Sequence, residues 1–332
     1  MVRRVAFVLA GGKACRFQMP LQGWQDKCLA LFEGKPFLVH AIENASCVVD
    51  EVIVCINDDA ERRGIYLEVL EKHHLNARIV VDEKADVGGP MRAIFTGLRA
   101  VQADFCLTIP CDMPFVKPKI VGYLFSISED FEVVMPMWPN GKLETLFMVL
   151  KRSIILEIVQ TLCQLGRSHV DDIPRAAAKT LLLSPVKDLK TLDPELKSFI
   201  NINTLDDLKK LQPRNIQGPV KENIQLCQEG VITTNLQLMH KAAKMSQSDN
   251  FVGAQEKFDT CKKHFETYNN FFWTALACEG KGAFFDAANN YDNEAKIYEK
   301  NNCTRLLERA LADKALCETH PINTKTDSVK KS

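Results

Sequence analysis

The sequence predicts an α/β fold built on a mainly parallel sheet, followed by a smaller all-α part. Through the first 212 residues, short apolar runs typical of strands alternate with amphipathic segments typical of helices. Such alternation favours a parallel sheet covered by helices on both faces. Beyond about residue 234 the strand-like runs stop, and the helical segments repeat. A length of 332 residues also suggests two domains.

The composition excludes several classes of function. The chain carries 42 basic and 42 acidic residues, so no overall field draws it to nucleic acid or to an anionic membrane. No apolar run approaches the ~20 residues of a membrane span, and the start of the chain does not match a signal peptide. The 12 cysteines include no C-x-x-C pair, and most lie in apolar runs. We therefore expect reduced, buried thiols in a cytoplasmic protein.

The first apolar run, Val5 to Leu9, leads directly into Gly11 and Gly12, and the basic residues Arg16 and Lys27 follow. Because glycine has no Cβ, the backbone here can turn tightly and lie close to a ligand. The two basic residues supply the positive charge that a triphosphate requires. Taken alone, the segment is equally consistent with an ordinary βα turn, since it matches neither a P-loop nor G-x-G-x-x-G.

Three further runs are typical of strands, and each is followed by a polar residue. They are 51–56 with Asn57, 78–81 with Asp82, and 104–109 with Asp112. Sheets of this class bind ligands beyond the carboxyl ends of their strands. We therefore expect the three polar side chains to share one site.

The remainder of the first domain adds two strands and its last helices. Strands are predicted at 131–135 and 146–150, joined by the turn-forming residues 138–142. A helix is expected at 153–163. Near the end of the domain, Thr204 is a suitable N-cap for a final helix.

These residue types suit transfer of a nucleotidyl group. A triphosphate binds cations and backbone N–H groups, and a divalent metal neutralises charge that develops at the α-phosphorus. Mg²⁺ prefers a few carboxylates together with phosphate oxygens and water, which makes Asp112 a candidate magnesium ligand. Lys27 suits the phosphates as a mobile point charge. The alternatives are that Asp112 caps the helix after it and that Lys27 is a solvated lysine.

Five motifs occur in a single order along the first 212 residues. They are Leu9-Ala-Gly-Gly12 with Arg16, Gly23-x-x-Asp26-Lys27, Gly89-Pro90, Cys111-Asp112-Met-Pro-Phe115 and Phe199-Ile-Asn-Ile-Asn-Thr204. This series resembles the molybdenum cofactor guanylyltransferase family, the MobA-type nucleotidyltransferases. The resemblance implies a Rossmann-like nucleotidyltransferase domain over residues 1–212. The Asn-x-Asn-Thr ending is the motif that points to molybdopterin enzymes in particular.

The resemblance also implies a role for each matching position. The residues that would present their backbone to the guanine nucleotide are Leu9, Ala10, Gly11 and Gly12. Arg16 and Lys27 would face the phosphates, and Asp112 would bind Mg²⁺. Asp82 would contact the base or the ribose, whereas Asn201 and Asn203 would lie on the pterin side. The implied reaction joins GMP from GTP to the terminal phosphate of molybdopterin and releases pyrophosphate. Arg16, Lys27 and Asp112 would be the catalytic residues. For the two asparagines, capping of the last helix is the alternative role.

The sequence departs from the family pattern in places, and this keeps other functions open. The stretch Phe17–Gln22 enlarges the loop before Gly23, and Cys55 stands where relatives often have asparagine. One alternative is a related nucleotidyltransferase that uses CTP with molybdopterin, or GTP with a small phosphorylated acceptor. Another is a nucleotide-binding scaffold that serves a partner-binding repeat domain.

The second domain is expected at residues 235–318, after a linker at 213–234. Its repeat is seen where Ala254, Phe258 and Phe265 recur 33 positions later as Ala287, Tyr291 and Tyr298. A period near 34 residues with a small residue between two helices resembles the tetratricopeptide repeat. An irregular array of helical hairpins is the alternative. Stacked helix pairs offer a surface for a partner protein, and the polar tail 319–332 is expected to be disordered.

Overall fold

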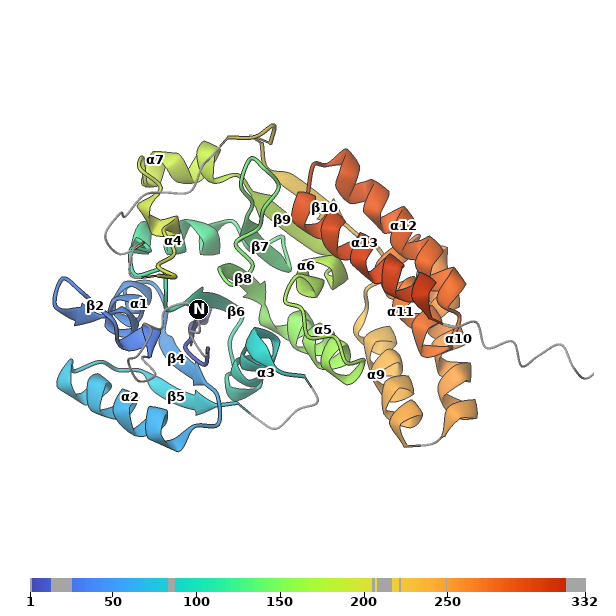
Figure 1. Ribbon diagram of the computed structural model, residues 1–332, viewed down its shortest axis with the longest axis horizontal. Helices are drawn as coiled ribbons and strands as arrows, with labels where there is room; N and C mark the ends of the chain where they lie inside the picture. The colour runs from blue at the N-terminus through green and yellow to red at the C-terminus, as the bar shows by residue number, and fades with distance from the viewer. Residues whose placement is uncertain are drawn as a thin grey trace, which may run out of the picture.

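The computed structural model describes residues 2–12, 26–82, 87–204, 207, 217–220, 222–248 and 250–320. Its centre is an eight-stranded sheet in the order β10-β9-β7-β8-β6-β1-β4-β5. Helices cover both faces of the sheet, and a group of C-terminal helices stands against the β10 side (Figure 1). The predicted combination of an α/β sheet and a C-terminal helical part is confirmed.

Six of the eight sheet strands follow predicted apolar runs, namely β1 (Arg4–Leu9), β4 (Glu51–Ile56), β5 (Arg78–Val81), β6 (Phe105–Pro110), β7 (Val133–Pro136) and β8 (Met148–Lys151). The other two were not predicted from the sequence, and they are β9 (Lys179–Leu183) and β10 (Ile224–Cys227). A separate two-stranded hairpin joins β2 (Leu31–Phe32) to β3 (Lys35–Pro36).

The helices fall into those that cover the sheet and those of the C-terminal part. The first group is α1 (Phe37–Ser46), α2 (Ala60–Lys72), α3 (Gly89–Ala100), α4 (Pro118–Ser126), α5 (Arg152–Gln164), α6 (Asp172–Ala176) and α7 (Lys190–Leu192), with short turns η2 (Lys27–Leu29), η3 (Pro185–Leu189) and η4 (Lys197–Phe199). The second group, which we call the helical lobe, is α9 (Thr233–Gln247), α10 (Phe251–Thr267), α11 (Phe271–Gly280), α12 (Phe284–Lys300) and α13 (Thr304–Thr319).

Strand β1 is the centre of the parallel region. It pairs in parallel with β4 on one side and with β6 on the other, and β4 pairs in parallel with β5. Strand β8 runs antiparallel to both β6 and β7, as the predicted hairpin requires. The carboxyl ends of β1, β4, β5 and β6 therefore meet along one edge of the sheet.

Alternate residues of β1 enter two separate apolar cores. Val5 and Phe7 belong to the core that includes α3 and α5, whereas Ala6 and Val8 belong to the core that includes α1 and α4. All four side chains are fully buried. A strand buried on both faces has a continuous apolar sequence rather than an alternating one, which explains the first apolar run.

The helical lobe shares a core with the sheet. The apolar core beneath α3 and α5 continues into α9 to α13 without a break. Trp273 of α11 donates a hydrogen bond from Nε1 to the carbonyl of Ala176, at 2.9 Å. The predicted linker 213–234 contains β10, which pairs antiparallel with β9 and forms the edge of the sheet. The lobe is thus held on the sheet by a strand as well as by its helices.

The repeated positions of the lobe occupy matching places. The small and aromatic residues that recur at a spacing of 33 are all buried, three on α10 and three on α12: Ala254, Phe258, Phe265, Ala287, Tyr291 and Tyr298. Their burial explains the repeat in the sequence. Assignment of these helices to the tetratricopeptide class stays a prediction, as do the exact domain limits and the partner protein.

A buried ionic cluster lies where α6 meets the lobe. Arg175 of α6 binds both carboxylate oxygens of Glu294, at 2.9 and 2.7 Å. It also donates to Asp172 and to Asp313 of α13, each at 2.7 Å. Arg167 contacts the same two aspartates. We call these five residues the junction cluster.

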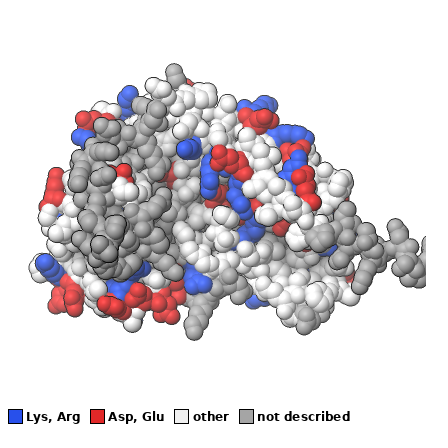
Figure 2. Space-filling view, viewed as in Figure 1, with Lys and Arg blue, Asp and Glu red and all other residues white. Residues whose placement is uncertain are grey.

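The surface of the lobe carries charges of both signs side by side. On the face shown in Figure 2, basic and acidic side chains are intermixed over α12 and α13. Asp292, for example, pairs with Lys296 and Lys314 at 2.8 and 2.7 Å. Among the described residues, none of the helices combines the length and apolar character needed to cross a bilayer.

Candidate active site

A cavity of about 590 Å³ opens at the carboxyl ends of the parallel strands. Its walls come from the loops after β1, β4, β5 and β6, and from the start of α3. The lining residues are Leu9, Gly11, Gly12, Lys27, Cys28, Asn57, Asp82, Gly89, Pro90, Arg92, Ala93, Pro110, Cys111, Asp112, Leu146 and Asn203. The cavity thus lies where parallel sheets of this class bind their ligands.

The loop after β1 lies directly against the neighbouring strand end. Ala10 donates its backbone N–H to the carbonyl of Cys55 at 2.9 Å, which extends the β1–β4 pairing by one residue. A Cβ at Gly11 would lie 3.0 Å from the backbone nitrogen of Asn57. Only glycine therefore fits at position 11 without displacing the backbone. Ala10 itself is buried in the core, so it can offer only backbone groups to a ligand.

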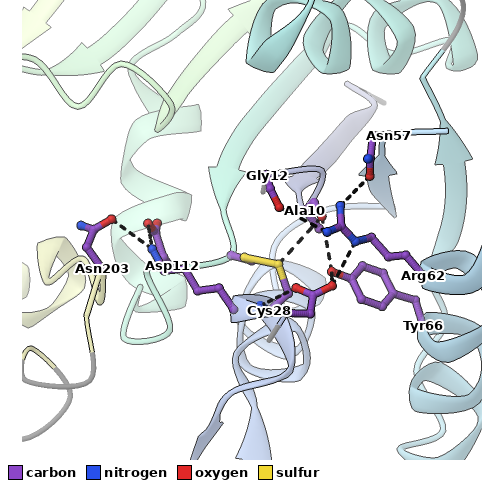
Figure 3. The surroundings of a disulfide bond; sticks show 11 residues. Ala10, Gly12, Cys28, Asn57, Arg62, Tyr66, Asp112 and Asn203 are labelled. Atoms are coloured by element: carbon purple, nitrogen blue, oxygen red, sulfur yellow. Dashed lines mark hydrogen bonds and ion pairs between the residues drawn. A yellow bond between two sulfur atoms is a disulfide. The ribbon is translucent and has the colours of Figure 1, made fainter. Parts of the chain in front are cut away.

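Lys27 lines the cavity and lies between two polar partners. Its Nζ is 2.6 Å from Oδ2 of Asp112 and 3.1 Å from Oδ1 of Asn203 (Figure 3). Asp112 follows β6, and its carbonyl accepts a hydrogen bond from the N–H of Ile202, which fixes the Asn203 segment beside it. Three segments distant in sequence thus bring a cation, a carboxylate and an amide together.

Asp82 occupies the opposite part of the cavity, at the end of β5. Its Oδ1 is buried and accepts no hydrogen bond from the described residues. Burial raises the pKa of this carboxyl from 3.8 to about 6, and the nearby Arg92 opposes that rise. A half-buried acceptor with an unused oxygen is suited to a ligand that offers N–H or O–H donors.

A disulfide joins the two polypeptide segments that carry Lys27 and Asp112. Cys28 and Cys111 are bonded, with their Cα atoms 5.8 Å apart, and both line the cavity. The prediction of reduced thiols is therefore wrong for this pair. Their 83-residue separation hid the contact, because only the folded sheet places η2 beside the end of β6. Cys55 and Cys106 are free and buried, as expected.

Most of the predicted site residues converge on the cavity. Leu9, Gly11, Gly12, Lys27, Asp82, Asp112 and Asn203 all line it. Asn201 lies apart, with its Nδ2 3.5 Å from Oε2 of Glu144. Arg16 and the enlarged loop Phe17–Gln22 lie outside the described residues. Thr204 makes the expected N-cap contact, since its Oγ1 accepts the N–H of Asp207 at 3.1 Å.

Sequence reasoning overlooked part of the surroundings. Arg62 and Tyr66 of α2 contact residues 10–12 after β1, which we call the glycine loop, and Arg92 of α3 lines the cavity. The spacing of Arg62 and Tyr66 by four residues on an otherwise exposed helix was the available signal, because such residues share one helical face.

The donor set is suited to Mg²⁺. Among the described residues, no three His, Cys, Asp or Glu side chains form a ready-made metal site. Mg²⁺ bound with a nucleotide needs only one or two carboxylates, because phosphates and water complete its octahedron. Asp112, rigidly placed at the end of β6 and beside a cation, meets that requirement.

The comparisons with known proteins agree with this geometry. Residues 6–178 match the model of the MobA-like NTP transferase domain. A protein named probable molybdenum cofactor guanylyltransferase from Methanosarcina acetivorans is 34% identical over 210 residues, which is 63% of this chain and 89% of the relative. One of the same name from Clostridium perfringens is 26% identical over 211 residues, covering 64% and 97%.

A solved structure supports the fold. Molybdopterin-guanine dinucleotide biosynthesis protein A from Archaeoglobus fulgidus superposes with a TM-score of 0.51 at 24% identity. The superposition covers 63% of this chain and 96% of that one. The family match ends at residue 178, before β9 and well before the helical lobe.

Proposed function

Because this chain belongs to the MobA-like NTP transferase family and is a nucleotidyltransferase, we propose that it transfers GMP from GTP to molybdopterin. In this reaction an oxygen of the terminal molybdopterin phosphate attacks the α-phosphorus of GTP. A new P–O bond forms, the bond between the α-phosphorus and the bridging oxygen breaks, and pyrophosphate leaves. Two relatives with this cofactor in their names support the choice of substrates.

The observation that carries the choice of guanine is the buried oxygen of Asp82, which accepts no hydrogen bond from the described part of the chain. Guanine offers N1–H and N2–H₂ as adjacent donors, and an ionised carboxylate accepts but cannot donate. A site that hydrogen-bonds such donors strongly rejects bases that lack them. We therefore assign Asp82 to the base rather than to the ribose. Leu9, Gly11 and Gly12 would supply backbone contacts to the nucleotide.

The other residues divide between phosphate and acceptor. Lys27 would bind the triphosphate, and the ligand would compete with Asp112 for its ammonium group. Asp112 would hold Mg²⁺, which when bound neutralises negative charge on the phosphate oxygens. Asn203 lies beside both, on the side assigned to the pterin. Asn201 would have an indirect role, through Glu144. We also propose Arg16 as a phosphate ligand, and this assignment depends only on its place in the sequence motif.

A nucleotide screen tests this proposal. The purified chain is incubated with Mg²⁺, molybdopterin and each of GTP, ATP, CTP and UTP, and pyrophosphate is measured. We expect release from GTP only, and none when molybdopterin is omitted. Turnover of CTP, or turnover of GTP only with a small phosphorylated acceptor, would identify a different member of the nucleotidyltransferases. Absence of turnover with every pair would favour a binding role.

We further propose that the helical lobe binds a partner protein, such as an enzyme that accepts the finished cofactor. Its position supports this, because the shared core and the junction cluster hold it at a fixed place beside the catalytic sheet. A pull-down with candidate acceptor enzymes, comparing the full chain with surface variants of α12, is the direct measurement.

A further inference from the structure

Helix α2 carries two buried polar side chains behind the glycine loop. Arg62 is 3% exposed and Tyr66 is fully buried, whereas most of their neighbours on α2 are exposed. Four residues apart, they lie on one face of the helix, which is turned toward the strands. A charged residue is rarely buried unless it is paired, so the partners of Arg62 define its role.

Arg62 connects three separate segments. Its Nε is 3.0 Å from Oδ2 of Asp26, one Nη donates to Oδ1 of Asn57 at 2.5 Å, and the other donates to the carbonyl of Gly12 at 3.3 Å (Figure 3). Asp26 directly precedes Lys27, Asn57 follows β4, and Gly12 belongs to the loop after β1. A planar guanidinium carries its donors on three separate nitrogens and can hold acceptors on three segments at once, whereas the donors of an ammonium all lie on a single atom.

Tyr66 also contacts the glycine loop and the Asp26 segment. Its hydroxyl lies 2.9 Å from Oδ2 of Asp26 and 3.3 Å from the carbonyl of Ala10. Burial, and then the Asp26 carboxylate, raises the pKa of Tyr66 above its ordinary value, so the hydroxyl keeps its proton. Asp26 in turn accepts the N–H of Cys28 at 3.0 Å and thereby caps the turn that carries Lys27.

The contact with Asn57 has a further consequence. A guanidinium donates hydrogen bonds but cannot accept them, so the oxygen of the Asn57 amide must face Arg62. The two N–H donors of that amide are then directed away from Arg62. Because Asn57 lines the cavity, these donors are available to an acceptor atom of the nucleotide. Arg62 thus determines which end of the amide the ligand meets.

We propose that Arg62 and Tyr66 are positioning residues for the nucleotide, acting through the glycine loop, Asn57 and the Asp26–Lys27 turn. The proposal rests on the proposed function in that the nucleotide is taken to be GTP. Neither side chain is required to touch it. Their effect comes from holding backbone carbonyls, an amide and a lysine in a single arrangement before the ligand binds.

The test measures binding of Mg·GTP by isothermal titration calorimetry, together with kcat and KM for pyrophosphate release. Arg62→Lys keeps a positive charge near Asp26 but loses the fork, and we expect its Kd and KM for GTP to rise about 10- to 100-fold. Tyr66→Phe removes a single hydroxyl and should raise them about 2- to 10-fold. Arg63→Lys is the matched control, since Arg63 is the next residue of α2 and is exposed.

A double-mutant cycle separates positioning from stability. If Arg62 acts through Asn57, the effect of Arg62→Lys on Kd should be markedly smaller in an Asn57→Ala background than in the wild type. A purely structural role would lower the melting temperature and the active fraction but leave the Kd of the folded protein unchanged.

The outcomes distinguish the two proposals. If wild type binds GTP, and Arg62→Lys and Tyr66→Phe bind it equally tightly, the positioning role is wrong while the proposed function stands. Fully additive effects of the Arg62 and Asn57 substitutions would also overturn the route through Asn57. If wild type binds no GTP, the proposed function fails, and the positioning role for GTP fails with it.

Discussion

Two groups of paired basic and acidic side chains in this molecule differ in their exposure to solvent. In the cavity, the side chains of Lys27 and Asp112 are 12% and 20% exposed. In the junction cluster, the side chains of Arg175, Asp172 and Asp313 are 0% exposed. A partly exposed pair can exchange its partner for a ligand at modest cost, whereas a fully buried set cannot lose a member without leaving a bare charge behind.

The difference separates charges that are committed to the architecture from charges that remain accessible to a ligand. Burial alone would raise the pKa of Asp172, but Arg167 and Arg175 overcome this and hold it below its ordinary value. That carboxylate is committed to its neighbours. Lys27, by contrast, has only Asp112 and Asn203 as described side-chain partners, and both line a cavity large enough for a nucleotide.

The largest expected effect on stability comes from the junction cluster. Arg175→Met leaves Asp172, Asp313 and Glu294 buried with too little opposing charge, and it should lower the free energy of unfolding by about 3–5 kcal/mol. Urea denaturation followed by circular dichroism measures this. Lys263→Met, which removes an exposed partner of Asp259, is the control and should change little. An unchanged denaturation midpoint for Arg175→Met would contradict an architectural role for the junction cluster.

In the cavity the expected pattern is reversed. Lys27→Ala should lower kcat/KM for pyrophosphate release about 10²- to 10³-fold, because a cation aimed at the phosphates is lost. Its melting temperature should stay close to that of wild type, since Asp112 still reaches water. Lys35→Ala is a suitable control because Lys35 pairs with Glu43 and the two side chains are 44% and 38% exposed. Strong destabilisation without loss of activity would show that Lys27 is structural.

For the disulfide between Cys28 and Cys111 we expect an intermediate effect on stability, because the bond joins two segments that line the cavity. Opening the loop that it closes should lower the free energy of unfolding by about 2–4 kcal/mol. Cys28→Ser with Cys111→Ser is compared with wild type in oxidising buffer and again with an added dithiol. The two proteins should converge in reductant. Equal stability in both buffers would show that the bond contributes nothing.

The smallest effect concerns Asp82 and pH. Its pKa of about 6 is higher than the 3.8 of an ordinary aspartate, so the folded chain binds this proton more tightly than the unfolded chain does. As pH rises from about 4 to about 6, stability from this group is therefore lost. GTP affinity should rise over the upper part of the same range, as the carboxylate ionises.

The predicted fall in stability and rise in GTP affinity are tested by measuring the melting temperature and the Kd for GTP from pH 5 to pH 8. Asp82→Asn should remove the inflection near pH 6 from both. It should also weaken discrimination between GTP and ATP, which follows from a contact with the base. If it weakened binding of all four nucleotides equally, Asp82 would instead face the ribose.

Six of the eight sheet strands and most of the cavity could be predicted because they depend on local pattern, whereas β9 and β10 were not predicted. Continuous apolar runs marked β1, β4 and β6, and the polar residue after each strand end marked the site, since parallel strands all end at one edge. Gly11 was identifiable for a related reason. Its missing Cβ is what lets the loop lie against Asn57.

What the sequence by itself determined is therefore the alternation of strands and helices, the repeat in the lobe and the convergence of Lys27, Asp82 and Asp112. Only the tertiary structure decided the partners of residues far apart in the chain. Arg175 meets Glu294 across 119 positions, and Arg62 meets Gly12 across 50. Hydrophobic periodicity indicates which face of a helix or strand is buried, but it does not indicate which buried charged side chains will form pairs. That pairing depends on how the elements stack, and here it joined the lobe to the sheet and α2 to the glycine loop.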